Sequence, residues 1–86
     1  MLEKTFVIRD PDGIHARPAG MLVKKMQEFP CTVTLQKGEK TADGKKLFAV
    51  MKLAVKQGES LVIKMDGENE EQAMAALEKV FEESGL

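Results

Sequence analysis

The chain has 86 residues, of which 43% are hydrophobic and 31% are charged, and its formal net charge at pH 7 is −1. This length predicts one domain, residues 1–86. The single cysteine excludes a disulfide within the chain and fits a reducing, cytoplasmic compartment. No apolar run approaches the roughly 20 residues that span a membrane, and residues 1–13 lack the apolar core of a signal peptide.

The first third of the chain predicts a strand followed by a helix. Residues 2–8 alternate in the manner of a strand, and the turn-forming residues 10–13 end it. A helix is expected next, because four apolar residues recur at helical spacing: Ala19, Leu22, Met26 and Phe29. Pro18 fits the first turn, where its missing N–H costs nothing, and Pro30 ends the helix.

The middle of the chain predicts two strands and a short helix. Residues 31–36 alternate between apolar and polar side chains, and residues 40–42 form a short partner strand after a tight turn. The pair Asp43-Gly44 turns the chain again. A helix of about two turns is then expected from its apolar stripe, which consists of Leu47, Val50, Met51 and Ala54.

The last third predicts a strand over residues 60–65 and a final helix that ends at Gly85. Asn69, followed by Gln72 three residues later, predicts a capping box at the start of this helix. Its buried stripe is expected to contain Ala73, Ala76, Leu77, Val80 and Phe81. The element order predicts an α+β fold, with helices on one face of a mainly antiparallel sheet whose strand order stays open.

Charge is distributed unevenly along the chain. Residues 14–58 carry nine basic and three acidic side chains, a net of +6, whereas residues 59–86 carry two basic and eight acidic ones, a net of −6. A locally basic surface attracts anions or an acidic partner, although each lysine alone could equally be ordinary solvated surface. With no Trp or Tyr and only four Phe, a stacking platform for nucleic acid is not expected.

The candidate functional residues lie around His15, which is the only histidine and lies just before the first predicted helix. Free backbone N–H groups and the positive end of a helix dipole favour an anion there. Arg17 can donate a fork of hydrogen bonds to phosphate oxygens, and a neutral imidazole is a good nucleophile. Phosphate chemistry is therefore one interpretation, although a lone histidine at a helix start is more often an N-cap or a surface residue.

Two other kinds of site find less support. No second histidine exists and Cys31 has no CxxC partner, so a zinc site within one chain is not expected, and the prediction is no metal. Ser60 and Ser84 are the only serines, and no nucleophile-elbow motif surrounds either of them.

The segment GIHARPA, followed by MLVKKM, resembles the active-site signature of the HPr family, the phosphocarriers of the bacterial sugar phosphotransferase system (PTS). The similarity extends over nearly the whole chain, including GKKLFAVMKLAV and DGENEEQAMAAL. The resemblance implies an open-faced βαββαβα sandwich, with four mainly antiparallel strands and three helices on one face. It also implies that phosphorylated enzyme I phosphorylates His15 on Nδ1, that Arg17 stabilises the phosphate, and that IIA domains accept it.

The same resemblance implies a monomeric phosphoryl carrier rather than a stand-alone enzyme, without a cofactor, a nucleic-acid partner or direct membrane insertion. It implies a docking surface on the short helix and on the segment after His15, although Leu47 and Met51 also fit a core role because they lie on the apolar stripe. The expected docking residues are Ala16, Gly20, Lys24, Lys40, Lys45, Leu47, Phe48 and Met51.

Two positions depart from the family pattern. Lys46 occupies the place where many Gram-positive members carry a regulatory serine, so no serine switch is expected. Gly20 stands where the family usually has a side chain, and a glycine inside a helix costs about 0.5–1 kcal/mol relative to alanine.

Three functions remain from the sequence: a carrier in sugar uptake, a related carrier in a nitrogen-linked or kinase-linked regulatory branch, and a non-catalytic binding module. The first two both use His15, and the identity of the acceptor protein would distinguish them. Loss of His15 or Arg17 would have favoured the third.

Overall fold

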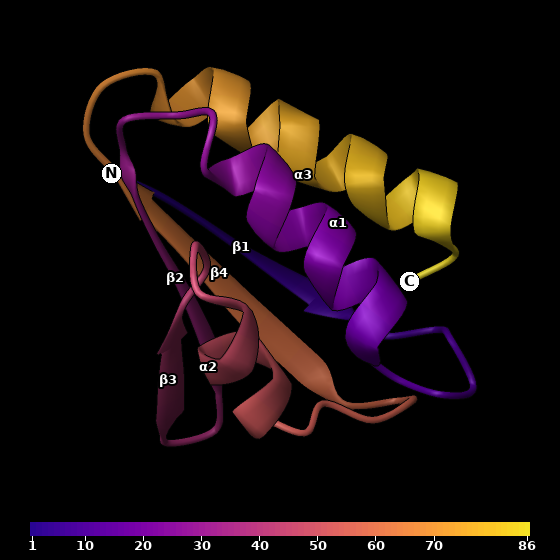
Figure 1. The fold of residues 1–86 in the computed structure, drawn as a ribbon. Coiled ribbons are helices and arrows are strands. Elements are labelled where there is room, and N and C mark those ends of the chain that lie inside the picture. The colour runs from indigo at the N-terminus through magenta and orange to yellow at the C-terminus, as the bar shows by residue number, and fades with distance from the viewer.

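A four-stranded antiparallel sheet, covered on one face by helices, forms the frame of the molecule (Figure 1). The computed structural model describes all 86 residues, and the strand order in the sheet is β1-β4-β2-β3. The elements in chain order are β1 (Leu2–Val7), α1 (Ala16–Met26), β2 (Thr32–Lys37), β3 (Lys40–Asp43), α2 (Leu47–Lys52), β4 (Ser60–Asp66) and α3 (Glu70–Ser84). The predicted α+β sandwich and its element order are confirmed.

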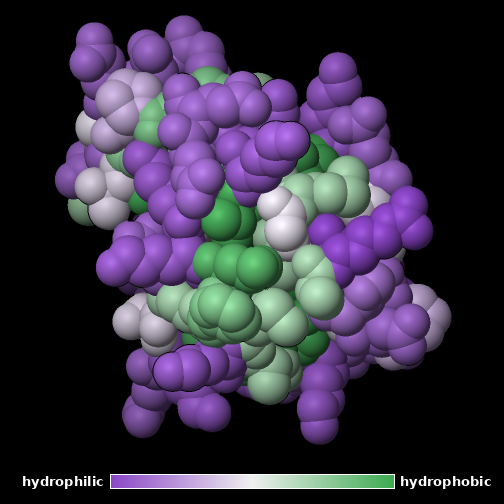
Figure 2. Space-filling model, in the orientation of Figure 1, coloured by the Kyte–Doolittle hydropathy of each residue, from purple (hydrophilic) through white to green (hydrophobic).

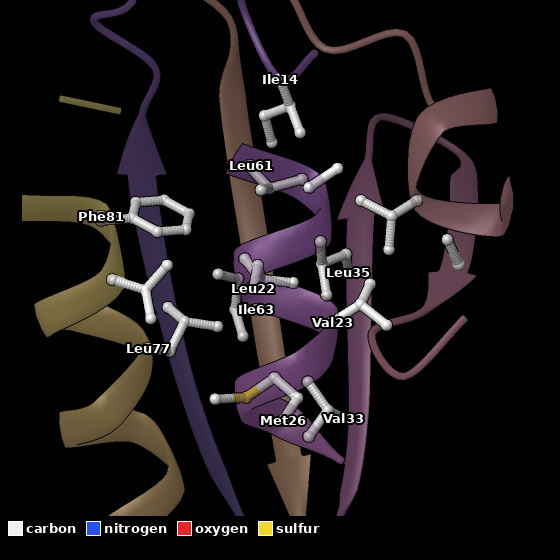
Figure 3. Close-up of a cluster of buried hydrophobic side chains, with 14 of the residues drawn as sticks. Ile14, Leu22, Val23, Met26, Val33, Leu35, Leu61, Ile63, Leu77 and Phe81 are labelled. Atoms are coloured by element: carbon white, nitrogen blue, oxygen red, sulfur yellow. The ribbon is translucent and has the colours of Figure 1, made fainter. Parts of the chain in front are cut away.

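The core lies between the sheet and the two long helices. In register across the sheet, Leu35 of β2 pairs with Ile63 of β4 and with Ala42 of β3, and all three are buried. Figure 3 shows Leu22 of α1 and Leu77 of α3 beside Ile63 in this cluster. Because 22 hydrophobic residues share one core, removal of apolar surface from water is the main stabilising contribution.

The other face of the sheet is open to solvent. The cross-strand pair Thr5 and Val62 lies there, as does Thr34, which pairs with both Lys64 and Asp43. None of these five side chains is buried. Strict alternation along β2 and β4 therefore reflects one covered face and one wet face, as the sequence predicted for these two strands.

Helix α3 packs beside the edge strand β1, and this fixes where its C-terminal end lies. The rings of Phe6 and Phe81 are 4.8 Å apart between centroids, and the Lys4 ammonium pairs with the Glu78 carboxylate. At the end of the chain, the backbone N–H of Arg9 donates to a Leu86 oxygen at 2.6 Å. The C-terminal end of α3 is thereby held beside the loop that follows β1.

The predicted capping box at Asn69 is wrong. Asn69 has φ 64° and ψ 25°, and its side chain makes no capping hydrogen bond. A capping side chain requires extended backbone at the N-cap, which a left-handed residue does not provide. The carboxylate of Glu70 instead accepts the Gly67 N–H at 3.0 Å.

The first two helices are shorter than the apolar spacing predicted. Helix α1 ends at Met26, and Phe29 belongs to a tightened turn in which its N–H donates to the Met26 carbonyl. Helix α2 ends at Lys52, because Ala54 has left-handed backbone with φ 51°. Of the four residues predicted for the apolar stripe of α2, only Val50 is buried.

No helix of the structure is both long and apolar enough to cross a membrane.

Candidate functional site

The turn over residues 10–13 delivers His15 to the start of α1. The Gly13 N–H donates to the Asp10 carbonyl at 2.9 Å, and the buried Ile14 donates its N–H to the Val55 carbonyl at 2.9 Å. Gly13 has φ 66°, and a Cβ there would lie 2.1 Å from that same Val55 oxygen. Only glycine fits this position, so the backbone leading into His15 is anchored on both sides.

His15 occupies the N-cap position of α1 but does not use its ring as a cap. Its backbone is extended, with φ −94° and ψ −177°, and its carbonyl accepts the Ala19 N–H at 3.0 Å. The imidazole makes no capping hydrogen bond, and 41% of the side chain is exposed. The ring is therefore accessible to another molecule while its backbone is fixed by the helix.

The start of α1 is electrostatically suited to an anion. The backbone N–H groups of Ala16 and Arg17 have no acceptor within the protein, and the first turn contains no acidic residue. The guanidinium of Arg17 is exposed and forms no ion pair. Unpaired N–H groups, the helix dipole and a free guanidinium together favour a phosphate placed beside His15.

A hollow of about 230 Å³ lies beside the ring of His15. The turn, the start of α1 and the end of α3 contribute its lining residues: Asp10, His15, Arg17, Pro18, Met21, Glu83 and Ser84. The Ser84 hydroxyl is already engaged, because it donates to the Val80 carbonyl at 2.5 Å. Sequence reasoning missed Asp10, Glu83 and Ser84. It gave Asp10 only a turn role, and it could not place Glu83 and Ser84 here because they reach the hollow through the packing of α3 beside α1 and β1.

Asp10 is the one side chain that contacts a ring nitrogen of His15. Its Oδ2 atom lies 3.4 Å from Nε2, and its Oδ1 atom accepts the Asp12 N–H at 2.8 Å. Asp10, Asp12 and His15 also form the only group of three potential metal ligands, with ligand atoms within 4.8 Å of one another. The hydrogen bond from the Asp12 N–H to the Asp10 carboxylate brings these two aspartates together in the turn.

The apolar residues predicted for docking gather on α2. Phe48 is 75% exposed, Met51 is 36% exposed and Leu47 is half-buried. Figure 2 shows an apolar patch over α2 and the adjoining side of α1, bordered by hydrophilic residues. The remaining predicted positions on α1 follow one another at intervals of four residues, which places them on one side of the helix: Ala16, Gly20 and Lys24.

The predicted lysines are in different surroundings. Lys24 is exposed on α1, whereas the ammonium of Lys45 donates to the Phe29 carbonyl at 2.5 Å and is partly buried. Lys40 begins β3 and lines a separate hollow with Ala49. Lys46 is the exposed N-cap of α2 and provides no capping hydrogen bond.

The chain is similar to known phosphocarriers over nearly its full length. The family described as "PTS HPr component phosphorylation site" matches residues 2–83. The phosphocarrier protein HPr of Lysinibacillus sphaericus is 42% identical over 86 residues, which cover 100% of this chain and 98% of that protein.

Solved structures agree with this similarity. The histidine-containing phosphocarrier protein of Mycoplasma superposes with a TM-score of 0.97 at 32% identity, covering 99% of this chain and 97% of that one. HPr of Thermoanaerobacter tengcongensis superposes with a TM-score of 0.90 at 33% identity, covering 95% and 92%.

Proposed function

Because the chain belongs to the PTS HPr family and is therefore a phosphocarrier, we propose that the transferred phosphoryl group is carried on Nδ1 of His15. The observation that carries this proposal is an exposed imidazole beside an uncapped helix N-terminus. Proteins of this family exchange phosphoryl groups with enzyme I and with IIA domains. Here enzyme I would be the donor and a IIA domain of sugar uptake the acceptor.

The residues around His15 support acceptance and release of phosphate. The phosphoryl oxygens would lie against the N–H groups of Ala16 and Arg17, where the helix dipole favours negative charge. The Arg17 guanidinium, free of other partners, would add charge-assisted hydrogen bonds. Because 41% of the His15 side chain is exposed, the phosphoryl group would remain accessible to the next protein.

The docking surface is proposed to combine the apolar patch on α2 with the exposed side of α1. Phe48 supplies the largest exposed apolar side chain in it. A basic surrounding would accelerate encounter with an acidic partner, since complementary charge acts mainly on the association rate. The complete proposed set is Ala16, Gly20, Lys24, Lys40, Lys45, Leu47, Phe48 and Met51.

Three further proposals concern regulation by a serine kinase, oligomeric state and cellular location. Lys46 stands at the N-cap of α2, and an amine there cannot accept a phosphate from a serine kinase, so no switch of that kind is proposed. A monomeric carrier is proposed from the family resemblance alone. The single cysteine is free and buried, which supports a reducing, cytoplasmic location.

The direct test is phosphorylation of His15→Ala by enzyme I and phosphoenolpyruvate. The wild type should gain one acid-labile phosphate, and the variant should gain none. His15→Ala is expected to fold normally, because the ring makes only one polar contact, and circular dichroism checks this. Acid-labile phosphate on the folded variant would show that another residue is the acceptor.

A further inference from the structure

We infer that Asp10 is a positioning residue for the reaction of His15, a role that rests on the proposed function of His15. Its carboxylate accepts the Nε2–H of the imidazole, so that the proton stays on Nε2 and the lone pair of Nδ1 faces the incoming phosphorus. The two nitrogens of a neutral imidazole differ in this respect, because the one that carries the proton cannot act as nucleophile.

The carboxylate of Asp10 is itself held in place by the turn. Its Oδ1 atom accepts the Asp12 N–H at 2.8 Å, and the Asp10 carbonyl accepts the Gly13 N–H at 2.9 Å. Only 16% of the Asp10 side chain is exposed. These bonds leave Oδ2 directed at Nε2 of His15, 3.4 Å away.

No other protein group makes a hydrogen bond to the ring of His15. The 3.4 Å separation is long for a hydrogen bond, but catalytic hydrogen bonds commonly tighten when the reacting partner arrives. Asp10 is therefore the only side chain in the structure that can select which ring nitrogen carries the proton.

The transfer step balances with Asp10 in this role. The Nδ1 lone pair forms the new N–P bond, and the bond from phosphorus to the donor group of enzyme I breaks, its electron pair leaving with the donor. The proton on Nε2 does not move, so the ring gains positive charge, which the Asp10 carboxylate offsets. In a hydrolytic triad an aspartate likewise fixes the imidazole tautomer, although there it bonds Nδ1–H and leaves Nε2 free to act as a base. Onward transfer reverses these changes.

Three other charged groups lie near Asp10 and His15, and one of them, Asp12, serves as a comparison. Arg17 and Glu83 line the hollow, and an oxygen of Asp12 lies within 4.8 Å of the ligand atoms of Asp10 and His15. Asp12 makes no side-chain hydrogen bond to the ring. Removing the charge of Asp12 therefore measures the effect of a negative charge near His15 that does not contact the imidazole ring.

The test compares Asp10→Asn, Asp10→Ala and Asp12→Asn. Asparagine keeps the size of the side chain and an oxygen that can accept the Asp12 N–H, so the turn is retained while the charge is lost. Alanine removes both the charge and the oxygen that accepts the Asp12 N–H. Nitrogen-15 NMR of the neutral ring reports which nitrogen carries the proton, and rapid-quench transfer from phosphorylated enzyme I separates the maximal rate from the KM.

We expect Asp10→Asn and Asp10→Ala to raise the population with the proton on Nδ1 and to lower the maximal transfer rate roughly tenfold, the effect of about one hydrogen bond to a charged group. The KM should stay within about twofold, because Asp10 lies outside the proposed docking surface. Asp12→Asn should keep the wild-type proton position and transfer rate.

Two results would overturn the inference. If Asp10→Asn matched the wild type in both readouts while Asp10→Ala did not, Asp10 would only form the turn. If Asp10→Asn and Asp12→Asn slowed transfer equally, overall charge rather than the contact would be responsible. If the wild type took no phosphate on His15, the proposed function would fail instead, and the NMR readout would still decide whether Asp10 holds the ring.

Discussion

Replacing Gly20 with alanine should stabilise the protein by about 1 kcal/mol. Gly20 lies in the middle of α1, and a Cβ added there would meet nothing within 4 Å. The substitution therefore introduces no clash. Alanine has a higher helix propensity than glycine, and it lowers the conformational entropy of the unfolded chain, so both effects favour the folded state. For a domain of this size, about 1 kcal/mol corresponds to a rise of about 4–8 °C in Tm.

Gly38→Ala is the matched control for this substitution. An added Cβ at Gly38 also meets nothing within 4 Å, but Gly38 has φ +59°. Left-handed backbone costs an alanine about 1–2 kcal/mol, so this change should destabilise the protein by about 1 kcal/mol. Urea unfolding measures both variants, with the slope of free energy against denaturant unchanged. A Gly20→Ala variant no more stable than the wild type would show that Gly20 is not a cost to α1.

Three further predictions follow from exposure, backbone angle and charge. Ala54→Gly should stabilise the protein by about 1 kcal/mol in urea unfolding, because Ala54 has φ 51°; a loss of stability would contradict this. The Lys56 N–H and then the Lys37 ammonium hold the pKa of Glu59 below its ordinary 4.5. The ionised Glu59 therefore stabilises the fold above pH 4.5, and this contribution is lost as pH falls through the lowered pKa. Glu59→Gln should therefore be less stable than wild type at pH 7, with the difference shrinking on acidification; a constant difference would contradict this. Phe48→Ala should change Tm by no more than about 2–4 °C, because Phe48 is 75% exposed, yet it should speed dissociation from enzyme I in surface plasmon resonance; an unchanged dissociation rate would exclude Phe48 from the docking surface.

The sequence predicted the strands β2 and β4 well because only one face of the sheet is covered. Val33, Leu35, Leu61 and Ile63 are buried as their alternation indicated. The order β1-β4-β2-β3 could not be read from periodicity, since period-two patterns describe which face a residue occupies and not which strand lies beside it.

Local backbone conformation explains the errors at helix ends. Asn69 and Ala54 both have positive φ, a property that residue type indicates only weakly for asparagine and not at all for alanine. Consequently the capping box did not form, and α2 ended two residues before the expected Ala54.

The candidate site was only partly predictable for a different reason. His15 and Arg17 lie in one short segment, so their proximity could be read from the sequence. Glu83 enters the same hollow because α3, distant in the sequence, packs beside α1 and β1. Asp10 was interpreted as a turn residue, and its turn geometry is also what directs its second carboxylate oxygen to His15.

The most direct test of the central claim is to identify the atom that carries phosphate. Uniformly nitrogen-15-labelled protein would be phosphorylated by enzyme I and phosphoenolpyruvate and observed by phosphorus–nitrogen correlation NMR. We expect one phosphoryl group per chain, coupled directly to Nδ1 of His15. Coupling to Nε2, phosphate on Ser60 or Ser84, or no bound phosphate would contradict it.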